Sequence, residues 1–279
     1  MSRPFRRLAF GLRTLFGLGA RGYFIPYRYA GRGGSEDYPA LLPLFRAAEP
    51  SFQEVLEAIE GHAEALEAIG GAAPAPRFEQ DWFPRLDAAA AYALVRMTKP
   101  ARILEIGSGH STRFLVRAVA DGALATEITC IDPAPRAAIA ALPVTHLASS
   151  LAEADPNLLE CLAPGDILFI DSSHIAMPGS DVDRLLLDLL PRLPGGVLVH
   201  IHDILLPDAY PESWRWRGYN EQLLVGCLLQ GGGFRLRFAS SYVTHYMTAE
   251  TTQGILSRLP LVTGALETSL WLEKPKDSP

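Results

Sequence analysis

A short apolar segment that runs directly into a glycine turn is the feature that most constrains the fold of this chain. Residues 103–106 are typical of a buried strand, and residues 107–109, Gly-Ser-Gly, predict a tight turn after it. Ser111 or Thr112 can then cap a helix. A strand, a glycine turn and a helix N-terminus together form a loop that binds nucleotide-type ligands in α/β proteins.

Glu105 indicates which ligand such a loop would accept. Its position predicts a carboxylate beside the turn, where the pyrophosphate of a dinucleotide would lie, and like charges at short range repel each other. S-adenosylmethionine has no phosphate and carries a sulfonium and an ammonium group. Glu105 therefore favours S-adenosylmethionine, and with it methyl transfer.

Strands and helices alternate regularly from residue 101 onward. Strands are predicted at 101–107, 127–132, 144–149, 166–171 and 196–202, and helices at 111–121, 135–141, 150–162 and 180–190. In the last of these helices Ser180 is the predicted cap, with Asp183 at the third position. This alternation predicts a parallel sheet with helices on both faces.

The two ends of the chain differ from this pattern. A helix near 219–230, a strand near 234–246 and a strand at 269–274 close the chain, and the two strands can pair antiparallel. Before the alternation, Ser51 and Glu54 form a capping box that predicts a helix over 51–69, and a second helix is predicted over 87–97. We therefore expect residues 1–76 to form a basic arm and helical extension, and residues 77–279 to form the ligand-binding domain.

Two positions are expected to hold the nucleoside part of the ligand. Asp132 ends the second predicted strand, where an acid can accept hydrogen bonds from both hydroxyls of a ribose. Ser149, at the end of the third strand, is expected to border the adenine.

These motifs resemble a known family. The series of residues 105–109, then Asp132, then Asp171 is similar to that of class I S-adenosylmethionine-dependent methyltransferases. The resemblance covers roughly residues 78–275. It implies a Rossmann-like α/β fold with a seven-stranded, mostly parallel sheet that ends in an antiparallel hairpin.

Three longer segments narrow the resemblance to the subgroup called methyltransferase family 24. They are residues 107–112, 168–174 and 195–204. One departure is that the third glycine common in this loop is replaced by His110-Ser111. The implied cofactor is S-adenosyl-L-methionine, with binding residues Glu105, Gly107, Ser108, Gly109, His110, Ser111, Asp132, Ser149 and Asp171.

Four residues at the ends of strands four and five are expected to carry the chemistry: Asp171, His174, His202 and Asp203. In one mechanism His202 or His174 removes a proton from an acceptor hydroxyl, as a neutral imidazole does near neutral pH. In the other, Asp171, Asp203 and His202 hold a divalent metal ion, although a histidine ligand is unfavourable for Mg²⁺. Both mechanisms stay open, and the metal is not favoured.

The charge of the chain limits which partners it is expected to bind. The net charge of −6 argues against nucleic acid as a partner, so we expect a small-molecule or glycan acceptor methylated on oxygen. Seven arginines precede the first acid, Glu36, and apolar residues lie among them, which is a pattern compatible with peripheral membrane contact.

Three scattered cysteines without metal-ligand spacing indicate a cytoplasmic protein. A homodimer is a further expectation, because residues 1–48 would otherwise cover little.

Two other readings compete with a methyltransferase. A nicotinamide-dependent oxidoreductase is disfavoured by Glu105, by the missing third glycine and by the absence of a Tyr-x-x-x-Lys pair able to reduce a carbonyl. A non-catalytic module that binds the cofactor and uses its arm to reach a membrane or partner is disfavoured by the His202-Asp203 pair.

Overall fold

A computed structural model describes residues 3–18, 28, 36–155 and 157–276 of the chain. It contains two compact units, Met1–Glu36 and Asp37–Pro279. The described part of the first unit is mainly helix α1 (Arg3–Leu15). The sequence placed a boundary after residue 76 instead, and that boundary stays a prediction.

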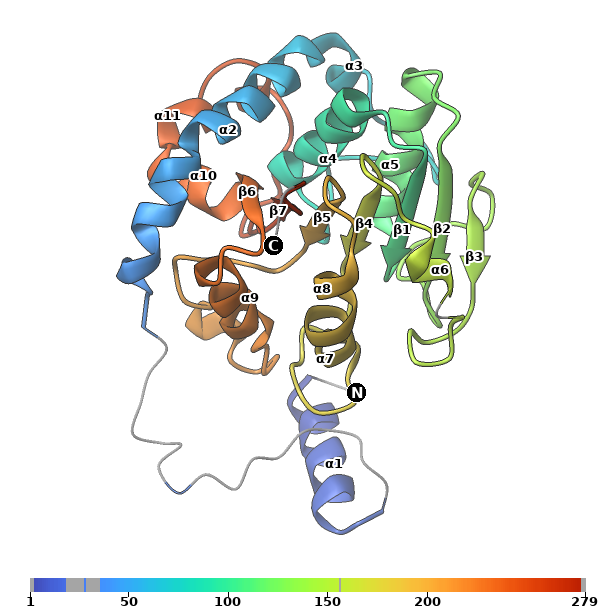
Figure 1. Cartoon of the computed structure of the whole chain (residues 1–279), viewed down its shortest axis with the longest axis vertical. Helices are drawn as coiled ribbons and strands as arrows, with labels where there is room; N and C mark the ends of the chain where they lie inside the picture. The colour runs from blue at the N-terminus through green and yellow to red at the C-terminus, as the bar shows by residue number, and fades with distance from the viewer. Residues whose placement is uncertain (1–2, 19–27, 29–35, 156, 277–279) are drawn as a thin grey trace. The chain divides into compact units, whose positions relative to one another are not determined.

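The second unit is built on one seven-stranded sheet with the strand order β3-β2-β1-β4-β5-β7-β6 (Figure 1). The strands are β1 (Arg102–Ile106), β2 (Glu127–Ile131), β3 (Thr145–Leu147), β4 (Ile167–Ile170), β5 (Leu198–Ile201), β6 (Arg235–Ala239) and β7 (Leu270–Glu273). The first five strands pair in parallel, whereas β7 pairs antiparallel with both β5 and β6. The predicted fold class and its C-terminal antiparallel hairpin are confirmed.

Helices lie on both faces of this sheet (Figure 1). They are α2 (Leu42–Gly61), α3 (Ala63–Glu67), α4 (Arg85–Thr98), α5 (His110–Asp121), α6 (Asn157–Glu160), α7 (Asp181–Arg184), α8 (Leu190–Arg192), α9 (Glu221–Gln230), α10 (Ser240–Tyr246) and α11 (Thr248–Thr251). A π-helical turn, Leu185–Leu189, joins α7 to α8, and short 3-10 turns cover Pro39–Leu41, Glu212–Trp214 and Ile255–Ser257. Strands β4 and β5 are buried along their whole length, which explains their continuous apolar sequence.

The strand predicted near 234–246 is wrong in its second half. Strand β6 ends at Ala239, and residues 240–246 form helix α10. Tyr242 and Val243 are buried in the hydrophobic core, so packing in that core holds these residues in the helix.

The extension helix also begins earlier than the capping box predicted. Helix α2 starts at Leu42 and includes Pro50, and the hydroxyl of Ser51 donates to the carbonyl of Arg237 on β6 at 3.1 Å. Buried Phe45 stacks on Tyr242 with ring centroids 5.3 Å apart, so packing on α10 holds the additional N-terminal turns.

Two predicted helices are largely absent. Residues 135–141 form bends and turns, and among the described residues of 150–162 only Asn157–Glu160 is helical. Pro133, Pro135 and Pro143 restrict the backbone of the first segment, and of its residues 135–141 only Ile139 is buried. Without a continuous apolar face, the segment has little burial to stabilise a helix.

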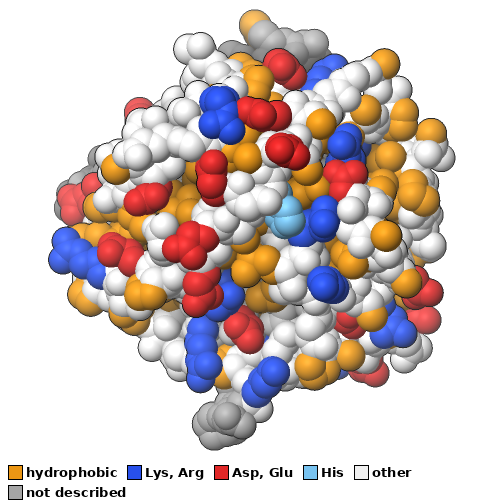
Figure 2. All heavy atoms as spheres, turned by 90° about the horizontal axis from the view of Figure 1, so that it is seen from above, with side chains coloured by type: hydrophobic (Ala, Val, Ile, Leu, Met, Phe, Trp, Pro, Cys, Tyr) orange, Lys and Arg blue, Asp and Glu red, His pale blue; other side chains and the backbone are white. Residues whose placement is uncertain are grey.

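Helices α2 and α3 lie at the top of the second unit in Figure 1, and Figure 2 shows the surface seen from that side. On that face hydrophobic side chains are interspersed with acidic and basic ones (Figure 2). Among the residues that the structure describes, no helix combines the length and the hydropathy needed to span a bilayer.

Candidate functional site

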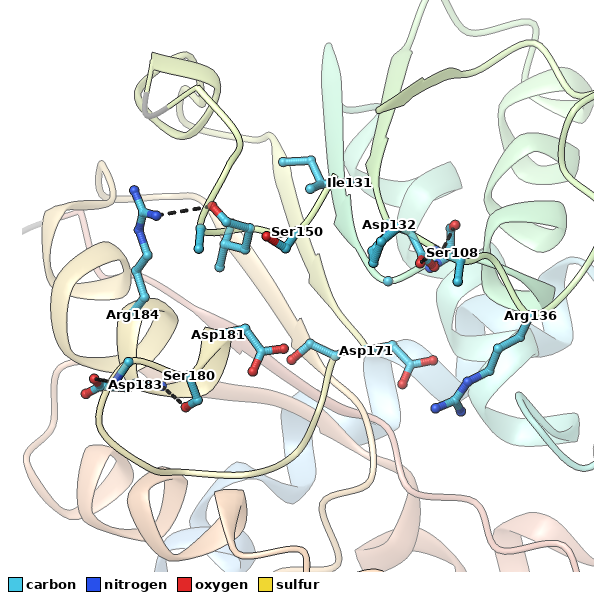
Figure 3. A pocket seen from close by; sticks show the side chains of 17 residues that line it. Ser108, Ile131, Asp132, Arg136, Ser150, Asp171, Ser180, Asp181, Asp183 and Arg184 are labelled. Carbon is cyan, nitrogen blue, oxygen red and sulfur yellow. Dashed lines mark hydrogen bonds between the residues drawn. The ribbon is translucent and has the colours of Figure 1, made fainter. Parts of the chain in front are cut away.

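A pocket of about 740 Å³ opens at the carboxyl ends of the parallel strands (Figure 3). The segments that follow β1, β2, β3 and β4 form its walls. It is lined by Gly107, Ser108, Ile131, Asp132, Pro133, Ala134, Arg136, Ser150, Leu151, Ala152, Asp171, Ser172, Gly179, Ser180, Asp181, Asp183 and Arg184. Ligands of open α/β sheets bind at this edge, at the point where strand order reverses, which here is the junction of β1 with β4.

The turn after β1 is shaped by Gly107. Its φ of +83° lies in the left-handed region, and a Cβ atom there would lie 1.9 Å from the carbonyl oxygen of Asp171. The missing side chain thus lets the β1 turn and the end of β4 lie against each other. The backbone N–H and the hydroxyl of Ser108 then donate to Oδ2 of Asp132 at 2.7 and 3.0 Å.

Asp132 lies on the pocket wall at the end of β2, facing Ser108 (Figure 3). Its Oδ1 accepts from the backbone N–H of Ala134 at 2.7 Å. These bonds fix the carboxylate in one orientation. Oδ2 already accepts two hydrogen bonds, whereas Oδ1 accepts one and keeps acceptor capacity.

Glu105 lies outside the pocket lining. It is fully buried, and its carboxylate accepts from the hydroxyls of Ser111 at 2.6 Å and Thr112 at 2.7 Å. Burial raises the pKa of Glu105 to about 7, although these hydrogen bonds oppose the rise. The side chain therefore joins β1 to the first turn of α5.

The other predicted residues of this loop also lie beside the pocket rather than in its lining. Gly109, not Ser111 or Thr112, is the N-cap of α5, and Thr112 Oγ1 accepts from the Gly109 N–H at 2.9 Å. Burial lowers the pKa of His110, and nearby arginines lower it further. Ser149 does not line the pocket, but its neighbour Ser150 does.

Sequence reasoning missed the pocket wall opposite Asp132. There Ser180 caps α7 by accepting from the Asp183 N–H at 3.1 Å, and Arg184 donates to the carbonyl of Leu151 at 3.2 Å (Figure 3). The Ser180–Asp183 cap was predicted and is confirmed. A helix start so soon after β4 was the available signal for this wall, because the ends of parallel strands share one edge.

The pocket wall carries an excess of negative charge. Four of its side chains are acids, Asp132, Asp171, Asp181 and Asp183, whereas Arg136 and Arg184 are its two bases. This balance disfavours a ligand rich in phosphate and favours one that carries positive charge.

A cluster of acids and histidines lies next to Asp171. Nε2 of His174 lies 3.3 Å from Asp171 Oδ1 and 3.5 Å from Asp203 Oδ2, and its Nδ1 lies 2.9 Å from Glu221 Oε2. Both His174, at φ +60°, and Asp203, at φ +56°, have left-handed backbones. Strained non-glycine residues of this kind concentrate at functional sites.

His202 completes the cluster. Its Nδ1 lies 3.5 Å from Asp171 Oδ1 and 3.7 Å from Asp203 Oδ1, while Nε2 lies 3.3 Å from Oδ2 of Asp87 on α4. Strand β5 ends at Ile201, so His202 and Asp203 are free of strand alternation and lie on the same side. The structure thus brings all four predicted reaction-centre residues together, and it adds Asp87 and Glu221.

Charge in this cluster decides the protonation of both histidines. Burial disfavours the cationic form, but the surrounding carboxylates outweigh it and raise the pKa of His174 and of His202 well above the usual value. Although burial opposes it, the same contacts hold the pKa of Asp171 well below its usual range. Near neutral pH the two imidazoles are therefore cations between carboxylates.

Asp171, His202 and Asp203 were also the predicted ligands of a metal ion. Across residues 3–18, 28, 36–155 and 157–276, no group of three or more His, Cys, Asp or Glu side chains is arranged to hold a metal ion. Both ring nitrogens of His202 face carboxylates, so neither presents a free lone pair in this arrangement.

Aromatic side chains cover the reaction centre from the segment after β5. Tyr219 packs on the His174 ring with centroids 4.6 Å apart, and Trp214 lies 6.0 Å from Tyr219. The guanidinium of Arg217 stacks over Trp214 at 3.9 Å, and its Nη1 lies 3.3 Å from Asp203 Oδ2. We call Tyr210, Trp214, Arg217 and Tyr219 the aromatic segment.

Residues 104–204 match a family model described as a methyltransferase domain. The matched residues make up about a third of the chain, and over this range the chain is similar to that family. The match begins in β1 and ends just after Asp203, so it includes the β1 turn, Asp132 and the four predicted residues of the cluster, but not Asp87 or Glu221. The predicted class I methyltransferase, similar to family 24 and dependent on S-adenosylmethionine, is confirmed at the level of the family.

Three of the solved structures to which this chain is similar are described as methyltransferases. A Podospora anserina methyltransferase bound to S-adenosylhomocysteine is 15% identical with a TM-score of 0.40, covering 91% of this chain and 99% of its own. A putative O-methyltransferase from Klebsiella pneumoniae is 19% identical with a TM-score of 0.41, covering 81% and 90%. The Streptomyces achromogenes O-methyltransferase TomG, involved in tomaymycin synthesis, is 18% identical with a TM-score of 0.40, covering 78% and 90%. None of the curated proteins compared with this chain matches it.

Proposed function

We propose that this methyltransferase transfers a methyl group to a hydroxyl oxygen of a small molecule or glycan. The observation that carries the proposal is the position of Asp171. It lies both in the pocket lining and in the cluster with His174 and His202. One carboxylate thus borders the cofactor pocket and the reaction centre.

The residues of the pocket fit S-adenosylmethionine. Gly107 provides the close approach between the β1 turn and β4, and Oδ1 of Asp132 is fixed where it can accept from a ribose hydroxyl. The acids of the wall suit a ligand with a sulfonium and an ammonium group. When bound, the cofactor supplies an activated methyl carbon.

The proposed proton acceptor is Asp171 rather than a histidine. His174 and His202 are already cationic near neutral pH, so neither can take another proton. Asp171 is ionised, and its side chain is 23% exposed. A weak base suffices because the acceptor hydroxyl becomes strongly acidic as its oxygen bonds to the methyl carbon. The two cationic histidines orient the Asp171 carboxylate and stabilise its negative charge.

The aromatic segment is the proposed acceptor platform. Tyr219 and Trp214 pack beside His174 and offer flat apolar faces next to the reaction centre. Such faces suit an aromatic ring or a sugar ring.

Calorimetry tests the cofactor site. Wild type is expected to bind S-adenosylmethionine and S-adenosylhomocysteine, and Asp132→Ala to lose at least about tenfold in affinity. Asp188→Ala, which alters an exposed acid outside the pocket, is the control. Binding of NAD with no binding of either nucleoside would overturn the proposal.

An acceptor screen tests the reaction. Release of S-adenosylhomocysteine is measured with panels of phenols, catechols and sugars, and with matched amines. Turnover of a hydroxyl compound that Asp171→Asn abolishes supports the proposal. Turnover restricted to amines contradicts O-methylation.

We also propose that α1 contacts an anionic membrane surface. Phe5, Leu8, Leu12 and Leu15 repeat at helical spacing and are between 44% and 66% exposed. Arginines are the only charged residues that precede Glu36. Full-length protein should sediment with vesicles of phosphatidylcholine and phosphatidylserine, and less with phosphatidylcholine alone. Leu8→Glu/Leu12→Glu should abolish sedimentation, and equal sedimentation of this variant would refute the contact.

A further inference from the structure

Asn220 is the N-cap residue of helix α9, but its side chain has a partner outside that helix. It makes no capping bond to α9. Instead Oδ1 accepts from the Ala176 N–H at 2.6 Å, and Nδ2 donates to the Ala176 carbonyl at 3.0 Å. Asn220 therefore pairs with the backbone of the loop that follows β4.

Glu221 and the adjacent backbone extend this pairing to His174. The N–H groups of Asn220 and Glu221 donate to the His174 carbonyl at 3.2 and 3.3 Å. The Glu221 side chain is fully buried, and its Oε2 lies 2.9 Å from Nδ1 of His174. Five contacts thus join two segments whose positions in the sequence differ by more than forty residues.

These contacts hold His174 in an unfavourable backbone conformation. Its φ of +60° lies in the left-handed region, which is unfavourable for a residue with a Cβ atom, so neighbouring contacts must maintain it. Held in this way, the ring directs Nε2 at Asp171, 3.3 Å away, and at Asp203, 3.5 Å away. The orientation of the ring thus depends on the two residues that begin α9.

We propose that Asn220 and Glu221 are positioning residues of the methyl-transfer site. They act through His174, which fixes the carboxylates of Asp171 and Asp203 relative to each other. This inference rests on the proposed function. The two acids follow different strands, β4 and β5, and His174 bridges them. Without the support of His174, both acids would still follow their strands, but the relative orientation of their carboxylates would no longer be fixed.

Asn220 and Glu221 directly follow Tyr219, the last residue of the aromatic segment. Tyr219, next to Asn220 in the chain, packs on the ring of His174. An acceptor that contacts the aromatic segment would therefore also contact the group that aligns the two acids.

Four variants of the full chain test the inference. Glu221→Leu removes the acceptor for His174 Nδ1, whereas Glu221→Gln keeps an oxygen there and is the conservative rescue. Asn220→Ala removes both bonds to Ala176. Glu57→Gln, at an exposed acid on α2, is the control.

The measurements separate positioning from folding. With the acceptor found in the screen, Glu221→Leu and Asn220→Ala should lower kcat by about 10- to 100-fold and leave KM for S-adenosylmethionine within about threefold. Glu221→Gln should keep most of the activity. Hydrogen exchange of residues 172–177 should accelerate in Glu221→Leu and Asn220→Ala, while the Kd for S-adenosylhomocysteine stays unchanged.

The two proposals fail differently. Unchanged kcat in Glu221→Leu, or equal losses in Glu221→Gln and Glu221→Leu, would overturn the positioning role. Unchanged hydrogen exchange in both Glu221→Leu and Asn220→Ala would overturn it even if no acceptor is found. Failure of wild type to bind either nucleoside would refute the proposed function instead.

Discussion

Gly107 and Asp171 approach so closely that a Cβ atom on the glycine would lie 1.9 Å from the aspartate carbonyl oxygen. The contact joins the turn after β1 to the end of β4, the two central strands of the sheet. It brings the cofactor loop and the proposed proton acceptor together, and a substitution at Gly107 tests that arrangement directly.

Gly107→Ala is expected to separate the β1 turn from β4. The new methyl group meets backbone atoms that cannot rotate away, and φ of +83° is unfavourable for alanine, so we expect a loss of about 3 kcal/mol in unfolding free energy. The affinity for S-adenosylhomocysteine should fall at least about tenfold. Urea unfolding and calorimetry measure both effects. Gly231→Ala, at φ −70°, is the control, and equal behaviour of the two variants would contradict the close-contact explanation.

Glu105 should make stability depend on pH. Because its pKa is about 7 in the fold and 4.5 as a model group, the folded state binds the additional proton between these values. The contribution of protonated Glu105 to the free energy of unfolding is complete below about pH 4.5, and it is lost as the pH rises through about 7. The loss is on the order of 3 kcal/mol.

Glu105→Gln should remove this pH dependence. Relative to wild type, the variant should gain stability between pH 5 and pH 8, as measured by urea unfolding. Glu127→Gln, on the neighbouring strand with its side chain 80% exposed, is the control. A constant difference between wild type and Glu105→Gln across this range would show that Glu105 stays ionised.

Asp87 is expected to be essential for stability. Its buried carboxylate accepts from the backbone N–H groups of Thr268 at 2.9 Å and Ser269 at 2.8 Å, and it faces His202. Asp87→Ala leaves two buried donors and a cationic ring without an acceptor, so we expect a loss of about 3 kcal/mol or more. Chemical unfolding checks this, and a loss as small as that of the exposed Asp188→Ala would refute it.

The pH profile of the reaction distinguishes the two proton acceptors. The pKa of Asp171 lies well below its usual range, so an aspartate acceptor predicts a kcat/KM that is flat from about pH 8 to about pH 5.5. A neutral histidine base predicts about a tenfold decrease per pH unit below its pKa. The binding of S-adenosylhomocysteine over the same range is the control for cofactor loss.

Local sequence patterns predicted the elements whose signal is short-range. Residues 103–106 lie in β1 (Arg102–Ile106), and Ser180 caps α7 as its spacing with Asp183 indicated. Helix α2 and residues 240–246 departed from prediction because contacts such as Phe45 on Tyr242 decide them. Those contacts join segments nearly two hundred residues apart, so no local window contains them.

Apolar periodicity and strand ends are encoded locally, so the parallel sheet, the β1 turn and four residues of the proposed reaction centre were predictable from the amino-acid sequence. The direction in which their side chains point depends on tertiary packing. Packing directed Glu105 into the interior, placed Asp87 and Glu221 against His202 and His174, and turned Asn220 toward Ala176. Burial and neighbouring charge set protonation, and both arise only when distant segments pack together.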